Sequence, residues 1–186
     1  TAFAIAGLNA NIMSGLIDGG GDGDNNDTLI ADDAVPTTFV IAATNAGTMT
    51  GIGGGFNSFE NLTGGDSADT FQLNGGTLSG SIDGGGSNDT LIGDDSVSTM
   101  FAIAATDSGT VTGVANGFNN LENLAGGDSA DTFQFNGGTL SGSIDGGGGV
   151  DTIDYSAYTT PVEFDVGDGT GTGLGSHTNL ENVVLP

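Results

Sequence analysis

The stretch FNSFENLTGGDSADTFQLNGGTLSGSIDGGG at residues 56–86 returns, almost unchanged, as FNNLENLAGGDSADTFQFNGGTLSGSIDGGG at residues 118–148. The two copies begin at Phe56 and at Phe118, which sets a 62-residue period. Self-similarity at a fixed period is typical of repeat architectures, in which each repeat packs on its neighbours. We therefore expect a single domain over residues 1–186, with repeat units of approximately 1–62, 63–124 and 125–186.

A finer period of about 20 residues runs inside the long repeat. One column of threonines recurs at nearly constant spacing, usually followed by a large apolar residue: Thr28, Thr48, Thr70, Thr90, Thr110, Thr132, Thr152 and Thr172. A second, apolar column has nearly the same period: Ile17, Ile41, Leu62, Ile82, Ile103, Leu124, Ile144, Phe164 and Val183. Two columns that share one period indicate that each 62-residue repeat contains three coils.

The local pattern within each coil favours strands and turns. Apolar residues alternate with Thr, Ser or Gln in short runs, and Gly, Asp and Asn separate the runs. Strands that recur in one phase stack in parallel, which predicts an all-β fold, a parallel β-solenoid of about nine coils of ~20 residues. With about 4.8 Å per coil, the rod would be about 43 Å long. The usual crossover rule favours a right-handed solenoid.

The composition excludes several classes of protein. The chain has 37 glycines, 24 acidic residues and one histidine, with no lysine, arginine or cysteine, and its net charge is −24. So much glycine disfavours a helical bundle. Without a basic side chain the protein has no electrostatic hold on nucleic acid, and it is repelled by anionic membranes. The apolar runs are too short to span a bilayer, so we expect neither a nucleic-acid partner nor membrane insertion.

The turns carry a nine-residue pattern: GGDSADTFQ (64–72), GGGSNDTLI (84–92), GGDSADTFQ (126–134) and GGGGVDTID (146–154). This pattern resembles the repeats-in-toxin nonapeptide, a family in which parallel β-rolls bind Ca²⁺ between stacked turns. Carried over by position, the resemblance implies side-chain ligands at Asp69, Asp89, Asp131 and Asp151 and carbonyl ligands at Gly64, Gly84, Gly126 and Gly146. The longer first turn, GGGDGDNNDTLI (19–30), keeps the corresponding Asp27.

The sequence departs from that family, because the nonapeptides are not in tandem and Ser67, Ser87 and Ser129 replace the fourth glycine. Physics still gives a reason to expect a cation. Asp69 and Asp89 would lie about 4.8 Å apart in adjacent coils, where two carboxylates repel by about 3.5 kcal/mol at an effective dielectric of 20. A bound Ca²⁺ or a raised pKa would relieve this repulsion. The alternative is that the aspartates cap turns through backbone N–H groups and face water.

The two ends of the chain match each other. Val183 and Ile17 would be one coil period apart if the tail of one copy were followed by the head of the next. Without gaps, NLENLAGGDSADTFQFN (120–136) aligns with NLENVVLP (179–186) followed by TAFAIAGLN (1–9). We expect copies to stack head to tail in a filament, although a segment of a longer covalent solenoid would give the same match. The expected interface consists of Thr1, Phe3, Ile5, Leu8, Val183, Val184 and Leu185.

The C-terminal third, residues 144–183, resembles segments of very large secreted bacterial β-strand-repeat proteins and adhesins. That resemblance implies an extracellular or cell-surface location. We therefore expect a structural protein with no catalytic role, whose partner is another copy of itself. The alternative is a calcium-stabilised adhesin or spacer module whose outer face binds ice, through its threonines, or a surface glycan.

A polysaccharide-modifying enzyme is the most distant alternative. Solenoid lyases and epimerases need cationic or tyrosine groups, and this chain offers Tyr155, Tyr158 and His177. His177 stands in a Gly/Ser/Thr-rich stretch, which predicts a solvated turn.

Overall fold

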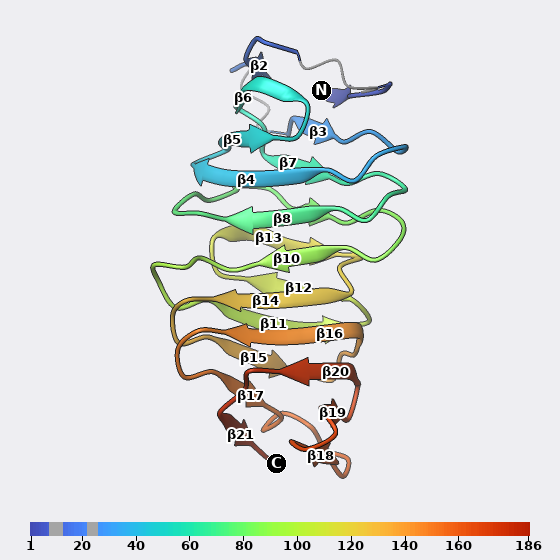
Figure 1. Cartoon of the computed structure of the whole chain (residues 1–186), viewed down its shortest axis with the longest axis vertical. Coiled ribbons are helices and arrows are strands. Elements are labelled where there is room, and N and C mark those ends of the chain that lie inside the picture. The colour runs from blue at the N-terminus through green and yellow to red at the C-terminus, as the bar shows by residue number, and fades with distance from the viewer. Residues whose placement is uncertain (8–12, 22–25) are drawn as a thin grey trace.

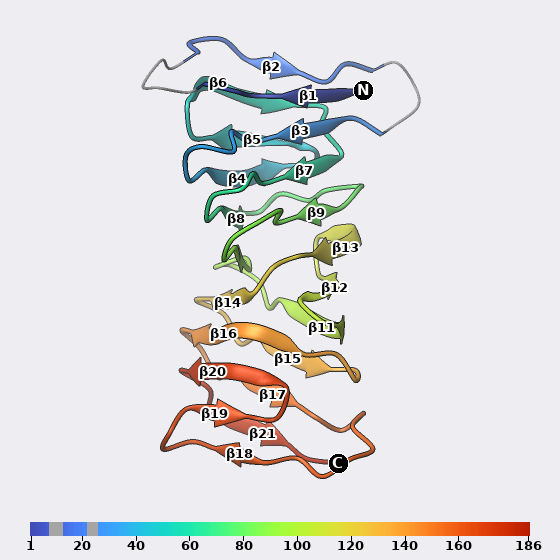
Figure 2. The same ribbon diagram turned by 90° about the vertical axis from the view of Figure 1, so that its right-hand side faces the viewer.

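The computed structural model describes residues 1–7, 13–21 and 26–186, so the predicted interface residue Leu8 lies outside the described residues. The described residues form strands and turns but no helix, which confirms the all-β prediction. None of them therefore provides a helical membrane span. Two large sheets face each other along a tall stack, with the N-terminus at one end and the C-terminus at the other (Figures 1 and 2).

Within the described ranges, one sheet has ten strands and the other eleven. In spatial order the ten-stranded sheet contains β1 (Ala2–Ala4), β3 (Thr28–Ile30), β7 (Asn61–Thr63), β9 (Ile82–Asp83), β13 (Val114–Asn119), β12 (Ser108–Val111), β11 (Met100–Ala105), β15 (Thr132–Phe135), β17 (Thr152–Asp154) and β21 (Asn182–Val184). The eleven-stranded sheet contains β18 (Phe164–Asp165), β19 (Thr170–Gly171), β20 (Leu174–Thr178), β16 (Leu140–Gly147), β14 (Asn123–Gly127), β10 (Thr90–Ile92), β8 (Thr70–Leu73), β4 (Thr38–Ala43), β5 (Ala46–Met49), β6 (Ile52–Asn57) and β2 (Ile17–Asp18).

Most neighbouring strands in the described ranges are parallel, and in four pairs the residues opposite each other are 20 apart, the predicted coil period. Thr70 lies opposite Thr90 in one sheet, and Leu62 lies opposite Ile82 in the other. The chain passes from one sheet to the other between these strands, so that each coil contributes one strand to each sheet. This largely parallel arrangement is consistent with the expected solenoid.

Each repeat also contains a three-stranded antiparallel meander, which the periodicity did not predict. The meanders are β4–β5–β6, β11–β12–β13 and β18–β19–β20. Thr48 pairs with Val40 inside the first meander, so the prediction of one continuous threonine column is wrong. The chain reverses between β4 and β5 through Asn45, whose positive φ of 55° is one that Asn tolerates better than most residues. A uniform coil of ~20 residues therefore does not describe the whole chain.

The 62-residue repeat acts as a half-turn about the stack axis. The first meander belongs to the eleven-stranded sheet, the second to the ten-stranded sheet, and the third to the eleven-stranded sheet again. The ring pair Phe39–Phe71 in one sheet and its counterpart Phe101–Phe133 in the other are both stacked at 4.9 Å and 3°. We call each strand position along the stack axis a rung. In the spatial order of the ten-stranded sheet, β21 lies seven rungs beyond β7, and it follows β7 by two repeats in the sequence. Each repeat thus advances three and a half rungs and exchanges the two sheets.

The core is a thin layer between the sheets, filled by rows of inward-facing residues. One row joins Phe71, Leu91, Leu124 and Ile144 in adjacent strands, each at most 1% exposed. This row draws on both columns found in the sequence, because a residue that follows a threonine comes to lie beside a member of the apolar column. Burying a side chain of this size contributes about 1.5–3 kcal/mol, so the stacking of rungs stabilises the fold.

Candidate functional site

Buried carboxylates link successive rungs on one side of the stack. Asp69 accepts a hydrogen bond from the Thr37 amide through Oδ1 at 2.6 Å. The Asp69 amide donates to Oδ1 of Asp89 at 2.7 Å, and the Asp89 amide donates to Oε2 of Glu122 at 2.8 Å. We call this series of amide-to-carboxylate bonds a carboxylate ladder. It shows that the aspartates cap the backbone, as the second of the two interpretations predicted. That interpretation also placed them in water, which is wrong, because Asp69 and Asp89 are at most 1% exposed.

The same ladder recurs one repeat later. The Thr99 amide donates to Asp131, the Asp131 amide to Asp151, and the Asp151 amide to Glu181, at 2.6, 2.7 and 2.7 Å. The glutamate of each Glu-Asn-Leu/Val sequence therefore ends a ladder, a role that the sequence did not indicate.

A shorter ladder lies at the N-terminal end. The ammonium group of Thr1 pairs with Oδ1 of Asp27 at 2.6 Å, and the Asp27 amide donates to Oε2 of Glu60 at 2.9 Å. Thr1 thus occupies the position that an aspartate holds in the other two ladders.

The four glycines predicted as carbonyl ligands make room for these carboxylates. A Cβ atom on Gly64, Gly84, Gly126 or Gly146 would lie 2.4–2.7 Å from Oδ2 of the aspartate five residues later. The same Cβ would also meet a backbone carbonyl of the neighbouring rung, for example Gly84 O at 2.0 Å from Gly64. Any larger residue would displace both the carboxylate and the neighbouring rung.

Burial makes the ladder carboxylates harder to ionise. Desolvation raises the pKa of Asp89 and of Asp131 from 3.8 to about 6, against the opposing effect of their backbone hydrogen bonds. The pKa values of Asp69 and Asp151 are raised for the same reason. Neighbouring carboxylates add to the shift, as Asp69 and Glu122 do for Asp89. The direction of these pKa shifts is the one that relieves the predicted repulsion between adjacent rungs.

The ladder aspartates are the side chains that were predicted to bind calcium. Among the described residues, no group of three or more acidic or histidine side chains is placed to hold a metal ion. The Oδ1 atoms are used by backbone amides, and the unpartnered Oδ2 atoms of Asp89, Asp131 and Asp151 are buried against glycine. Ca²⁺ takes six to eight oxygen ligands, which include backbone carbonyls as well as carboxylates. Calcium binding stays a prediction.

The two ends of the stack have open sheet edges. At the N-terminal end the outermost strands are β1 and β2, and at the C-terminal end they are β21 and β18. Of the predicted interface residues, Thr1 and Phe3 are exposed at one end, whereas Ile5 is 5% exposed and packs into the core. Val183 is half-buried at the other end, next to the exposed Val184 and Leu185.

The register of β1 corrects the gap-free alignment of the two ends. Phe3 lies opposite Leu29, just as Phe133 lies opposite Ile153. Phe3 is therefore the counterpart of Phe133, whereas the alignment matched Phe133 to Ala6, three residues further along. The link from Val183 to Phe3 would be three residues shorter than the internal link from Leu124 to Phe133.

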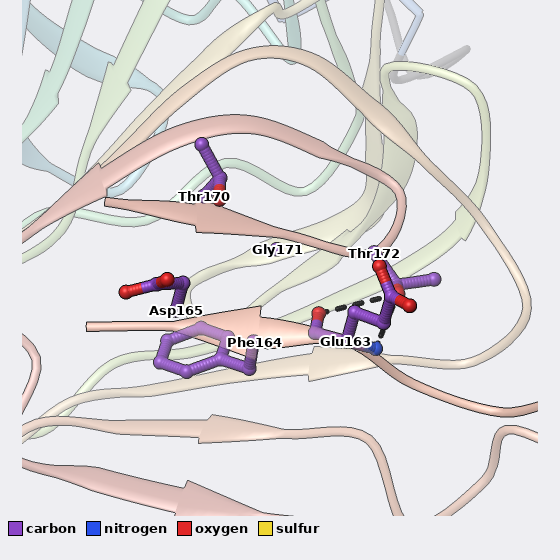
Figure 3. Close-up of a pocket in the computed structure, with 6 residues that line it drawn as sticks. All are labelled: Glu163, Phe164, Asp165, Thr170, Gly171 and Thr172. Atoms are coloured by element: carbon purple, nitrogen blue, oxygen red, sulfur yellow. Dashed lines mark hydrogen bonds between the residues drawn. The ribbon is translucent and has the colours of Figure 1, made fainter. Parts of the chain in front are cut away.

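The C-terminal end of the stack is hollowed. A pocket of about 560 Å³ lies beside β18 and β19 (Figure 3), lined by Glu163, Phe164, Asp165, Thr170, Gly171 and Thr172. Inside this pocket the Thr172 hydroxyl accepts a hydrogen bond from the Glu163 amide at 2.8 Å. Two further pockets lie close by, lined by residues between 158 and 186. The core is thus open where β18 ends the sheet.

His177 lies in the core, so the prediction of a solvated turn is wrong. It stands at the inward-facing position of β20, opposite Ile144, and is 6% exposed. Its ring stacks on Phe164 at 4.2 Å, and Phe164 also contacts the ring of Tyr155 edge-on at 6.2 Å. The histidine therefore packs against aromatic rings in the core, which its Gly/Ser/Thr-rich sequence neighbours did not indicate.

The threonines form short rows on both sheets. The longest parallel row joins Thr38, Thr70 and Thr90, and Asn123 continues it.

Comparison with protein-family models, curated proteins and solved structures finds no match for this chain.

Proposed function

We propose that this chain is an extracellular structural protein, a right-handed β-solenoid subunit that stacks head to tail into a filament, fibre or sheath. The observation that carries the proposal is the pair of open ends, where edge strands with unpaired backbone groups can pair with another chain. Nine large apolar residues are exposed in the described structure, and six of them lie near these ends: Phe3, Met13, Leu16, Val166, Val184 and Leu185.

The composition supports a location outside a bacterial cell. A chain without lysine or arginine offers no cleavage site to trypsin-like proteases. Its partner in this proposal is another copy of itself, and a surface glycan is a further partner that the resemblance to adhesins suggests.

Electron microscopy and sedimentation of the purified chain at low concentration test the proposal. Filaments that lengthen with protein concentration are expected. Monodisperse rods at all concentrations would refute self-assembly and leave a spacer module. High ionic strength should be included, because the net charge of −24 opposes assembly and salt screens it.

The second candidate is a calcium-stabilised adhesin module. It is supported by the unpartnered Oδ2 atoms of Asp89, Asp131 and Asp151, which a cation or a proton would satisfy. A rise in the melting temperature on adding millimolar Ca²⁺, reversed by a chelator, would favour this candidate.

A further inference from the structure

We propose that successive copies meet after a half-turn about the stack axis, so that each sheet of one copy continues into the other sheet of the next. This inference rests on the head-to-tail stacking proposed above and specifies which edges meet. In it, β21 of one copy pairs with β2 of the next, and β18 pairs with β1. Each of these pairings joins a strand of the ten-stranded sheet to one of the eleven-stranded sheet.

The number of repeats sets this relation. One repeat exchanges the two sheets, as the alternating positions of the meanders show. Three repeats therefore leave the C-terminal end turned by a half-turn relative to the N-terminal end. A second copy continues the internal pattern only if it is turned by the same amount.

Internal strand pairs provide the template for β21 and β2. Leu62 lies opposite Ile82, and Leu124 lies opposite Ile144. Each leucine follows Glu-Asn, as Val183 does in β21, and each isoleucine stands in SGSIDGGG, as Ile17 does in SGLIDGGG at 14–21. Ile17 pairs with Phe56 on its inner side only. The missing neighbour of β2 is thus a strand of the β21 type.

A second template fits β18 and β1. The first strand of each internal meander pairs with the second strand after the meander: Phe39 lies opposite Phe71, and Phe101 lies opposite Phe133. Phe164 in β18 holds the position of Phe39 and Phe101, which lie opposite Met49 and Val111 as Phe164 lies opposite Gly171. In each meander the amide of the residue before the phenylalanine donates to the hydroxyl of the threonine that follows this partner, Thr50, Thr112 or Thr172. Phe3 holds the position of Phe71 and Phe133, since it lies opposite Leu29 as they lie opposite Leu91 and Ile153. Phe3 of the next copy would therefore meet Phe164.

Gly15 independently points to the same contact. Its counterparts are Gly80 and Gly142, where a Cβ atom would lie 2.3 and 2.5 Å from the Oδ1 atoms of Asn61 and Asn123. Within one copy, a Cβ atom on Gly15 meets nothing within 4 Å. In the proposed contact, Asn182 of β21 would occupy the place of those asparagines. A glycine that is unconstrained in the isolated chain becomes necessary at the junction.

The junction differs from an internal pair at one point. Leu185 holds the position of Gly64, where a Cβ atom would lie 2.0 Å from a carbonyl of the next rung. Pairing between β21 and β2 must therefore end at Val184. Outward-facing Val184 then lies opposite Asp18, in the relation that Thr63 has to Asp83.

The crossed junction also fixes the dimensions of the filament. A ten-stranded sheet followed by an eleven-stranded one gives twenty-one rungs for two copies. At about 4.8 Å per rung, each copy advances about 50 Å and the structure repeats every ~100 Å. This advance is longer than the sequence-based estimate, because the meanders add rungs.

Cysteine cross-linking distinguishes the crossed junction from an uncrossed one. The natural chain has no cysteine, and neighbouring strands bring Cα atoms within disulfide range. In a crossed junction Val184 meets Asp18, whereas in an uncrossed one, where β21 meets β1, it meets Ala4. All three side chains are exposed, so replacing them spares the core. Val184→Cys is mixed with Asp18→Cys in one sample and with Ala4→Cys in another, then oxidised mildly.

We expect a disulfide-linked dimer in the mixture of Val184→Cys with Asp18→Cys. We expect no such dimer in the mixture of Val184→Cys with Ala4→Cys. Cross-linking only with Ala4→Cys, or filaments without either cross-link, would overturn the crossed junction while leaving head-to-tail assembly intact. If the mixtures form neither filaments nor dimers, and the natural chain also stays monomeric, the proposed function itself fails. Image reconstruction of natural filaments supplies a second readout, a rotation near a half-turn per ~50 Å advance.

Discussion

Lowering the pH from about 7.5 to about 5 should stabilise this protein. Asp89 and Asp131 have a pKa of about 6 in the folded state, against an ordinary value of 3.8. A raised folded-state pKa means that folding favours the protonated form. The contribution of these two carboxyls to the free energy of unfolding is complete below their unfolded pKa of 3.8, and it is lost as the pH rises through about 6.

The magnitude follows from these two values. Folding with one such carboxyl ionised, as it is at about pH 7.5, is about 3 kcal/mol less favourable than folding with it protonated, and about half of that difference is regained at pH 5. The two carboxyls together should therefore add about 3 kcal/mol to the free energy of unfolding, as an upper value. Asp94 and Asp154 have lowered pKa values, so their contribution is lost only below pH 3.8 and does not act in this window.

Urea denaturation followed by circular dichroism at the two pH values measures the effect. The double variant Asp89→Asn/Asp131→Asn should lose most of the gain, because neither side chain can then titrate. The exposed pair Asp66→Asn/Asp128→Asn removes the same net charge and should keep the gain. A natural protein that is less stable at pH 5 than at pH 7.5, or a buried-pair variant that keeps the full gain, would refute the reasoning.

Three further outcomes are expected. Gly126→Ala should destabilise the fold by about 1–3 kcal/mol, measured by urea denaturation, because its Cβ would lie 2.3 Å from Gly146 O and 2.4 Å from Oδ2 of Asp131. Gly86→Ala is the control, since its nearest contact is 3.5 Å, and equal losses for both would contradict the argument. Gly15→Val should abolish filament growth in light scattering without lowering the melting temperature, whereas Gly21→Val, which also faces open space, should assemble normally. Because the inner carboxylates already cap amides, removing calcium with a chelator should leave the melting temperature within a degree or so; a large drop would favour the calcium-stabilised module.

Periodicity predicted the parallel part of the fold because a residue and its counterpart one coil period later lie in adjacent strands. Thr70 and Thr90 are such a pair. Periodicity failed in the meanders, where two residues one coil period apart in the sequence do not lie in adjacent parallel strands. Thr48 follows Thr28 by the same period, but it lies in the other sheet, in an antiparallel strand. The positive φ at Asn45 and at Asp107 marks the reversals, and both residue types occur widely in this chain.

The sequence also placed the aspartates in adjacent rungs, and the amide of Asp69 does bond the carboxylate of Asp89. It could not show what the carboxylates bind. The ladder begins at Thr37, 32 residues before Asp69, and ends at Glu122, 33 residues after Asp89. Such separations depend on the meander, so no local motif reveals them.

Because each repeat adds a half-turn, the number of repeats in a chain determines how its C-terminal end is oriented about the stack axis. If one 62-residue unit were duplicated, every surface feature beyond the insertion would move to the opposite broad face of the stack. If two units were duplicated, each feature would return to its original face. A gene of this kind could thus change the orientation of whatever follows the stack by gaining or losing a single unit, without altering any contact inside it.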